Sequence, residues 1–163
     1  MTAPGRRGIV LALGNDILGD DGAGIAAGRQ LKARVPDGVD VVEAGFGGFH
    51  LLDHLEGYPR ALVLDAVATG THPPGTVLSF PFEALGTEAG PSPHAVGLPT
   101  VVSLGRQSGV PLPRRIRIVA IEVEDMETVC EGLTPAVRKA VPRAADAVLG
   151  LLGAVPAVAV AVA

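Results

Sequence analysis

Three carboxylates and one amide side chain gather near the start of the chain, in residues 14–24. This segment follows an apolar run, Gly8–Leu13, that predicts a buried strand, and a helical pattern starts near Gly24. Its four glycines permit a tight path and a close approach of the backbone to a ligand. Ligands of open α/β sheets bind at the carboxyl ends of the strands, so the segment is a candidate site. An Asp/Asn/Gly turn with a helix N-cap is the structural alternative.

Two further side chains have the chemistry to join this segment. Asp65 interrupts an apolar run, residues 61–67, that predicts a strand. A carboxylate in a core strand needs a partner or a ligand. His94 follows Ser92 and Pro93 before a predicted helix, whose dipole would keep the imidazole neutral and suited to a metal. The structural alternatives are a carboxylate that accepts backbone N–H groups and a histidine that only caps the helix.

Asp21, Asp65 and His94 are therefore predicted to converge on one edge of a sheet. Two carboxylates and an imidazole suit Zn²⁺, Ni²⁺, Fe²⁺ or Mn²⁺, and they leave positions open for water or a substrate group. The sequence has no G-x-G-x-x-G after the first strand, no Walker A lysine and no G-x-S-x-G elbow. These absences argue against nucleotide binding and serine hydrolysis. The single cysteine, Cys130, has no obvious histidine partner for nucleophilic catalysis.

Alternating strand and helix patterns would hold these residues in place. They indicate a three-layer α/β/α sandwich with a five-stranded, mostly parallel sheet, similar to phosphorylase and hydrolase folds. The fourth strand follows the third after a short connection, so we expect an antiparallel hairpin there. The expected strands are residues 8–13, 39–44, 61–67, 76–82 and 115–123, and the last two helices are 95–107 and 135–152. The expected core residues of the helices are Ile25, Ala26, Leu31, Ala33, Leu51, Leu52, Leu55, Val96, Val101, Val102 and Leu104.

The composition is that of one globular domain. Of 163 residues, 48% are hydrophobic and 18% are charged, which excludes a disordered polyelectrolyte. We expect a single domain over residues 1–152 and a disordered Ala/Val-rich tail over 153–163. A formal charge of −4 argues against a nucleic-acid partner. With one cysteine no internal disulfide can form, so a cytoplasmic protein is expected. Pro156 argues against a membrane anchor in the tail.

Four motifs, in order and spacing, resemble those of the hydrogenase maturation endopeptidases. These enzymes trim the C-terminus of the large subunit of nickel–iron hydrogenases. The motifs are the Gly-Asn…Asp-Asp-Gly loop after the first strand, the Asp at the end of the third, Ser-Pro-His before a helix, and Gly-Leu-Thr-Pro before the last helix. In this chain they are residues 14–24, Asp65, 92–94 and 132–135.

The resemblance implies that Asp21, Asp65 and His94 are the catalytic and metal-binding residues. Because some members have Glu at the first position, Asp20 stays open as the alternative ligand. The implied partner is the large-subunit precursor, which supplies the nickel, and zinc or cadmium is expected to occupy the site in vitro. The glycine-bearing turn after the second strand, with Gly45, Gly47 and Gly48, is expected to accommodate the substrate tail.

The family is grouped with aspartic endopeptidases, but a pepsin-like dyad needs two carboxylates that share a proton, and a histidine beside them would perturb it. We favour chemistry in which the substrate's nickel polarises the scissile carbonyl or activates water, with a carboxylate as base. The main alternative is a nickel-binding assembly chaperone without proteolytic activity. Another is a different enzyme on a similar fold, such as a nucleoside phosphorylase, but residues 45–48 lack the polar groups of a phosphate loop. Client selectivity is expected in the loops 83–90 and 122–131.

Overall fold

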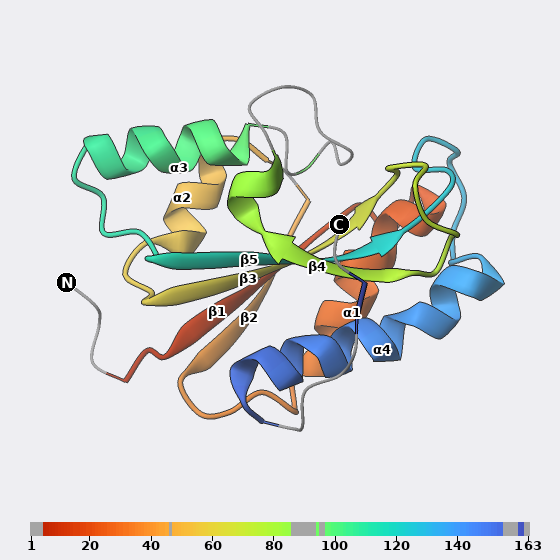
Figure 1. Cartoon of the computed structure of the whole chain (residues 1–163), viewed down its shortest axis with the longest axis horizontal. Coiled ribbons are helices and arrows are strands. Elements are labelled where there is room, and N and C mark those ends of the chain that lie inside the picture. The colour runs from red at the N-terminus through yellow and green to blue at the C-terminus, as the bar shows by residue number, and fades with distance from the viewer. Residues whose placement is uncertain (1–4, 46, 86–93, 95–96, 155–159, 162–163) are drawn as a thin grey trace.

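The computed structural model describes residues 5–45, 47–85, 94, 97–154 and 160–161. Its strands form one five-stranded sheet in the order β2-β1-β3-β5-β4 (Figure 1). Strands β2, β1, β3 and β5 run parallel to one another, and β4 is antiparallel to β5. The strands are β1 (Gly8–Leu13), β2 (Val39–Ala44), β3 (Arg60–Val67), β4 (Val77–Pro81) and β5 (Arg115–Glu122).

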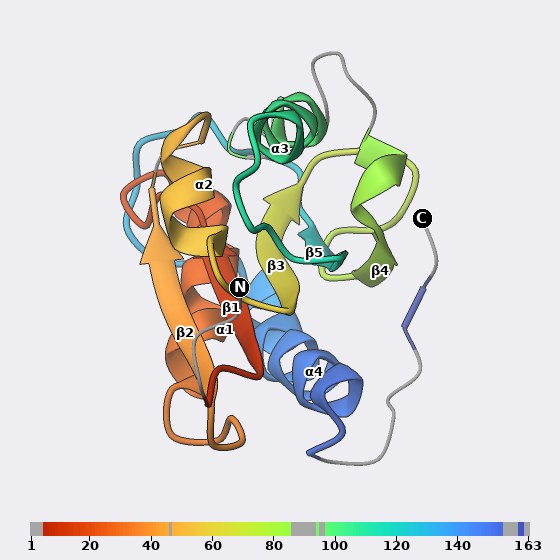
Figure 2. The same ribbon diagram turned by 90° about the vertical axis from the view of Figure 1, so that its left-hand side faces the viewer.

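Helices cover both faces of the sheet, so the predicted three-layer α/β/α sandwich is confirmed. Helices α1 (Ala23–Leu31) and α4 (Pro135–Leu152) lie on one face, and α2 (His50–Leu55) and α3 (Leu98–Gln107) lie on the other (Figure 2). Two 3₁₀ turns, Gly19–Gly22 and Phe82–Leu85, complete the described helical segments. Neighbouring residues of β1 serve different layers, because Val10 packs on the α1/α4 side and Leu11 on the α2/α3 side.

The expected hairpin between β3 and β4 is wrong. β5 lies between them, and β4 pairs with β5 in the register Leu78↔Ala120. The physical reason lies in the two strands themselves. β5 is apolar and buried from Ile118 to Ile121 and pairs with β3 along its whole length, whereas β4 ends in Pro81, which cannot donate to a sheet and favours an edge.

The predicted core is confirmed for Ile25, Leu31, Leu51 and Leu55, which are all buried. Ala33 is wrong, because α1 ends at Leu31 and Ala33 is exposed beyond it. Ala26 and Leu52 are only partly buried. In place of Ala33, Gly28 packs so closely on β1 that an added Cβ would lie 2.5 Å from the Cβ of Ala12.

Helix α3 is described from Leu98, with Gly97 as its N-cap in the left-handed region at φ +76°. Val101 and Val102 are buried as expected, and Pro99 lies in the first turn. Leu104 is 46% exposed, so its assignment to the core is wrong; it lies on the solvent side of the helix. Val96 lies outside the described residues.

Helix α4 has the predicted start, with Thr134 as its N-cap and Pro135 in the first turn, and it ends at Leu152. Beyond it, Ala161 forms a parallel bridge with Leu78 at the outer edge of β4. The division into a 1–152 domain and a disordered 153–163 tail stays a prediction. Among the described residues, we find no helix with the length and hydropathy of a membrane span.

Candidate active site

The loop after β1 is fixed by its own backbone. The chain leaves Leu13 through Gly14 at φ +146°, where an added Cβ would lie 2.4 Å from the carbonyl oxygen of Asp21. The N–H of Asp21 donates to the carbonyl of Leu18 at 3.2 Å, and the N–H of Asn15 donates to the carbonyl of Asp21 at 3.4 Å. The loop therefore sets the direction in which Asp21 leaves the backbone.

A second glycine brings this loop to the end of β3. A Cβ on Gly24 would lie 2.3 Å from the carbonyl oxygen of Leu13, 2.8 Å from that of Leu64 and 3.0 Å from the Cα of Asp65. Only glycine allows α1 to begin this close to the two strands. Asp21 and Asp65, which are 44 positions apart in the sequence, consequently lie at the same edge of the sheet.

Asp21 and His94 are in direct contact. The Nε2 atom of His94 lies 2.8 Å from Oδ2 and 3.0 Å from Oδ1 of Asp21. Asp21 is fully buried, and the His94 side chain is 11% exposed. The loop after β2 supports this histidine, because a Cβ on Gly47 would lie 2.5 Å from the carbonyl oxygen of His94. The structure thus brings together residues that are 73 positions apart in the sequence.

The pKa of His94 is raised, which is the opposite of the predicted neutral imidazole. The largest cause is the hydrogen bond to Asp21, and burial opposes it; the charges of Asp65 and Asp21 and the backbone carbonyl of Gly45 raise the pKa further. The described part of α3 begins at Leu98, four residues after His94, so the neighbouring carboxylates outweigh the helix dipole.

Asp65 is buried beside this pair, with 1% of its surface exposed. Its Oδ1 accepts the N–H of Ala66 at 2.9 Å, and its charge acts on His94. In the part of the chain that the structure describes, no group of three or more His, Cys, Asp or Glu side chains has the geometry of a metal centre. The site is a buried carboxylate–imidazole pair with a second carboxylate next to it.

The geometry favours Asp21 over Asp20 as the first site carboxylate. Asp20 accepts the N–H of Thr134 at 2.7 Å and its hydroxyl at 2.8 Å. Both carboxylate oxygens of Asp20 are therefore bonded to the start of α4, while Asp21 contacts His94.

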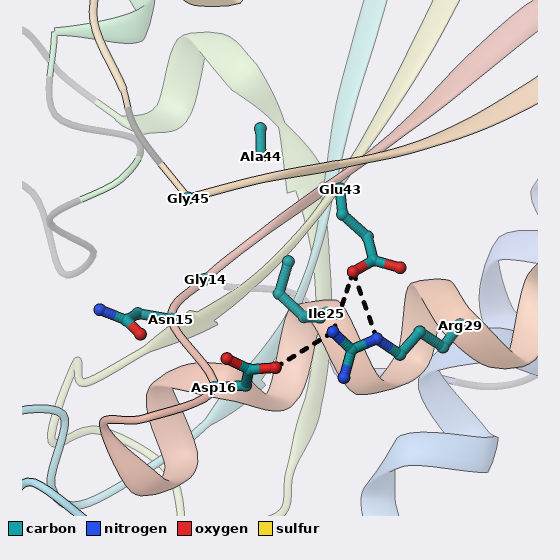
Figure 3. A pocket seen from close by; sticks show the side chains of 8 residues that line it. All are labelled: Gly14, Asn15, Asp16, Ile25, Arg29, Glu43, Ala44 and Gly45. Carbon is teal, nitrogen blue, oxygen red and sulfur yellow. Dashed lines mark hydrogen bonds and ion pairs between the residues drawn. The ribbon is translucent and has the colours of Figure 1, made fainter.

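A cavity of about 280 Å³ opens between α1 and the ends of β1 and β2, next to the site (Figure 3). The guanidinium of Arg29 bridges Glu43 at 3.0 Å and Asp16 at 3.1 Å, and Lys32 reaches Glu43 at 2.7 Å. No motif in the sequence predicted this ion-pair network. The one signal available is that Glu43, like Asp65, is a carboxylate near the carboxyl end of a strand. The cavity is lined by Gly14, Asn15, Asp16, Ile25, Arg29, Glu43, Ala44 and Gly45.

Glu122, at the start of the predicted selectivity loop 122–131, is a buried carboxylate. Its Oε1 accepts the backbone N–H groups of Thr69 and Gly70 at 2.8 and 2.9 Å, and its Oε2 accepts the Thr69 hydroxyl at 2.7 Å. Glu122 therefore holds the β3–β4 connection to the end of β5. Of the other proposed selectivity loop, 83–90, residues 86–90 lie outside the described part of the chain.

Comparison with known families decides what kind of protein carries this site. The model of the family described as "Hydrogenase maturation protease" matches residues 25–151. The chain belongs to the hydrogenase maturation protease family. The predicted family is thereby confirmed, and with it the assignment of the chain as a peptidase.

Relatives in this family match over most of their length. The chain is 32% identical over 149 residues to the hydrogenase 2 maturation protease of Escherichia coli, covering 88% of this chain and 89% of the relative. The structure of the hydrogenase maturating endopeptidase HybD from E. coli superposes with a TM-score of 0.79 at 30% identity, covering 90% of this chain and 92% of that one. The [NiFe] hydrogenase maturation protease HybD from Thermococcus kodakarensis superposes with a TM-score of 0.71, also at 30% identity, covering 90% and 99%.

Proposed function

We propose that this protease removes the C-terminal extension of a nickel-loaded hydrogenase large-subunit precursor, and that Asp21, Asp65 and His94 contact the nickel of the substrate. The observation that carries the proposal is the buried Asp21–His94 pair with Asp65 beside it, at the carboxyl edge of the sheet. The names of the relatives, which include a [NiFe] hydrogenase protease, support a hydrogenase precursor as the client. We further propose that it acts in the cytoplasm, because a chain with a single cysteine forms no internal disulfide and so needs no oxidising compartment.

The raised pKa of His94 bears on how the substrate's metal would bind. The contact with Asp21 favours the protonated ring, whereas a metal ligand must be the neutral imidazole. Substrate nickel would therefore compete with protons for His94.

Metal-assisted hydrolysis fits this arrangement better than a pepsin-like dyad. Such a dyad requires a second carboxylate on the oxygens of the first, and in this site His94 occupies both oxygens of Asp21. In the proposed reaction, the nickel polarises the scissile carbonyl and a site carboxylate takes a proton from the attacking water. The C–N bond then breaks, and the new amine of the departing peptide receives a proton.

The glycine turn after β2 is proposed to border the path of the substrate tail. Gly45 lines the cavity beside the site and contacts His94 through its carbonyl group. Gly47 packs on the backbone of His94. Gly48, at φ +76°, has none of the described atoms within 4 Å of an added Cβ, which leaves room beside the turn in the described part of the chain.

The test is the cleavage of two folded precursors that differ only in nickel content, followed by intact-mass spectrometry. We expect a discrete C-terminal peptide to be lost from the nickel-loaded precursor only. Efficient cutting of the nickel-free form would reject metal recognition while leaving the protease intact. Nickel-dependent binding without any loss of mass would favour the assembly-chaperone alternative.

A further inference from the structure

Two successive carboxylates in the site loop point in different directions. Asp21 contacts His94, while Asp20, which is 5% exposed, is bonded to Thr134. The two contacts of Asp20 are the N–H of Thr134 on Oδ1 at 2.7 Å and its hydroxyl on Oδ2 at 2.8 Å. Thr134 is the N-cap of α4, so this pair of bonds attaches the site loop to the start of the last helix.

The segment that precedes α4 holds the same loop at a second place. The N–H of Gly19 donates to the carbonyl of Cys130 at 2.8 Å, and the N–H of Cys130 donates to the carbonyl of Ile17 at 3.1 Å. These bonds form an isolated parallel bridge between Leu18 and Cys130. We call the Asp20–Thr134 bonds and this bridge together the α4 clasp.

The clasp acts on the 3₁₀ turn Gly19–Gly22 that carries Asp21. Gly19 and Asp20 are held from the α4 side, and Asp21 is held by its backbone bonds to Leu18 and Asn15. Since Asp20 and Asp21 are adjacent in one short turn, the bonds from Asp20 to Thr134 also restrain the backbone from which the Asp21 side chain leaves. The clasp thus ties the direction of the Asp21 carboxylate to the position of α4.

We propose that Asp20 and Thr134 are positioning residues that hold Asp21 in its metal-binding orientation, and that Asp20 is not itself a ligand. The inference rests on the proposed function in one respect, namely that Asp21 contacts the metal. Loss of a partner that is hydrogen-bonded directly to a metal ligand lowers metal affinity or activity by about 10- to 100-fold, and the clasp acts on Asp21 through the backbone, so the lower end of that range applies. We therefore expect an effect of about ten-fold when one of the two bonds is removed and a larger effect when both are removed.

The experiment uses the full chain with Cd²⁺ alone as the probe, measured by calorimetry, and the nickel-loaded precursor for kcat and KM. Thr134→Val keeps the branched shape and removes the hydroxyl, Thr134→Ser restores it, and Asp20→Ala removes both bonds. Asp146→Asn is the matched control, because Asp146 is a half-exposed carboxylate of α4 that pairs with Arg34 at 2.7 Å outside the site. All variants are compared below their melting temperatures. If Thr134→Val fails to fold, Asp20→Asn, which keeps the size of the side chain, replaces it.

We expect Thr134→Val to lower Cd²⁺ affinity and kcat by about ten-fold with KM little changed, Asp20→Ala to lower both further, and Thr134→Ser and Asp146→Asn to stay near wild type. Affinity and kcat within two-fold of wild type in Thr134→Val and Asp20→Ala, with only the melting temperature lowered, would overturn the inference. So would a loss of Cd²⁺ binding in Asp20→Ala that exceeds the loss in Asp21→Ala. If the wild type binds Cd²⁺ but cleaves no precursor, the proposed function fails and the Cd²⁺ series still decides the positioning role. A wild type that does neither overturns both.

Discussion

Helix α1 packs very closely on the ends of β1 and β3 at Gly24. Gly24→Ala therefore tests whether this close packing sets the distance between Asp21 and Asp65. The new Cβ would lie 2.3 Å from the carbonyl oxygen of Leu13, and backbone atoms there cannot rotate away. Restoring ordinary contact requires α1 to move by about 1 Å away from the strand ends. Overpacking of this kind costs about 1–3 kcal/mol, and the better helix propensity of alanine returns at most about 1 kcal/mol.

The same displacement acts on the chemistry. Asp21 lies three residues before Gly24, and the Cα of Asp65 is one of the atoms that the new Cβ would meet. The displacement of α1 therefore moves the two carboxylates apart. A misplacement of about 1 Å can cost about 100-fold in rate. We expect cleavage of the nickel-loaded precursor to fall by about that factor, while the melting temperature falls by only about 3–6 °C.

Gly28→Ala is the matched control for this experiment. It lies one turn further along α1, and its Cβ would meet the Cβ of Ala12 at 2.5 Å, a side chain of β1 rather than the backbone at the strand ends. We expect a similar loss of melting temperature and a much smaller loss of cleavage. Equal loss of rate in the two variants, or an unchanged rate in Gly24→Ala, would refute the argument that this glycine sets the distance between the carboxylates.

Three further predictions follow from particular contacts. In the metal-free enzyme the raised pKa of His94 means that its ion pair with Asp21 stabilises the fold fully below the ordinary pKa of 6.5, and that this contribution disappears as pH rises through the folded-state pKa. The melting temperature of wild type relative to His94→Gln should therefore be higher at pH 6 than at pH 9, and a difference independent of pH would contradict the ion pair. Glu122→Ala should lower the free energy of unfolding in urea by about 3 kcal/mol, because it strands the N–H groups of Thr69 and Gly70, whereas the exposed Glu124→Ala should change it by less than about 0.5 kcal/mol. Gly47→Ala should weaken Cd²⁺ binding measured by calorimetry, because its Cβ would displace the backbone of His94. Gly45→Ala, whose Cβ would meet the carbonyl oxygen of Gly14 at an ordinary 3.6 Å, should leave it unchanged.

The buried strands could be predicted from the sequence because their physics is local. β1 and β2 have the predicted bounds, and β1 is apolar throughout because both of its faces are covered. The N-cap of α4 was equally evident from Thr134 and Pro135. The partner of β4 could not be predicted, because the choice between β3 and β5 depends on how the whole sheet is filled.

The candidate site divides in the same way. The residue types and their places after strands predict that Asp21, Asp65 and His94 share one edge, and the structure places them there. The sequence does not show which of the adjacent Asp20 and Asp21 faces the histidine, since that depends on Thr134, more than a hundred residues away. The sequence also predicts a neutral His94, whereas its pKa is raised. The cause is the hydrogen bond to Asp21, which joins two loops that are distant in the sequence.

The measurement that tests the central claim most directly is intact-mass spectrometry of the nickel-loaded precursor with wild type, Asp21→Asn, Asp65→Asn, His94→Ala and a control, Asp146→Asn. Asp146 pairs with Arg34 at 2.7 Å on the exposed side of α4 and serves as a carboxylate outside the site. We predict loss of one discrete C-terminal peptide with wild type and Asp146→Asn, and an unshortened precursor with the three site variants. Normal shortening by any one of those three would contradict the role proposed for that residue, and shortening by all three would place the active site elsewhere.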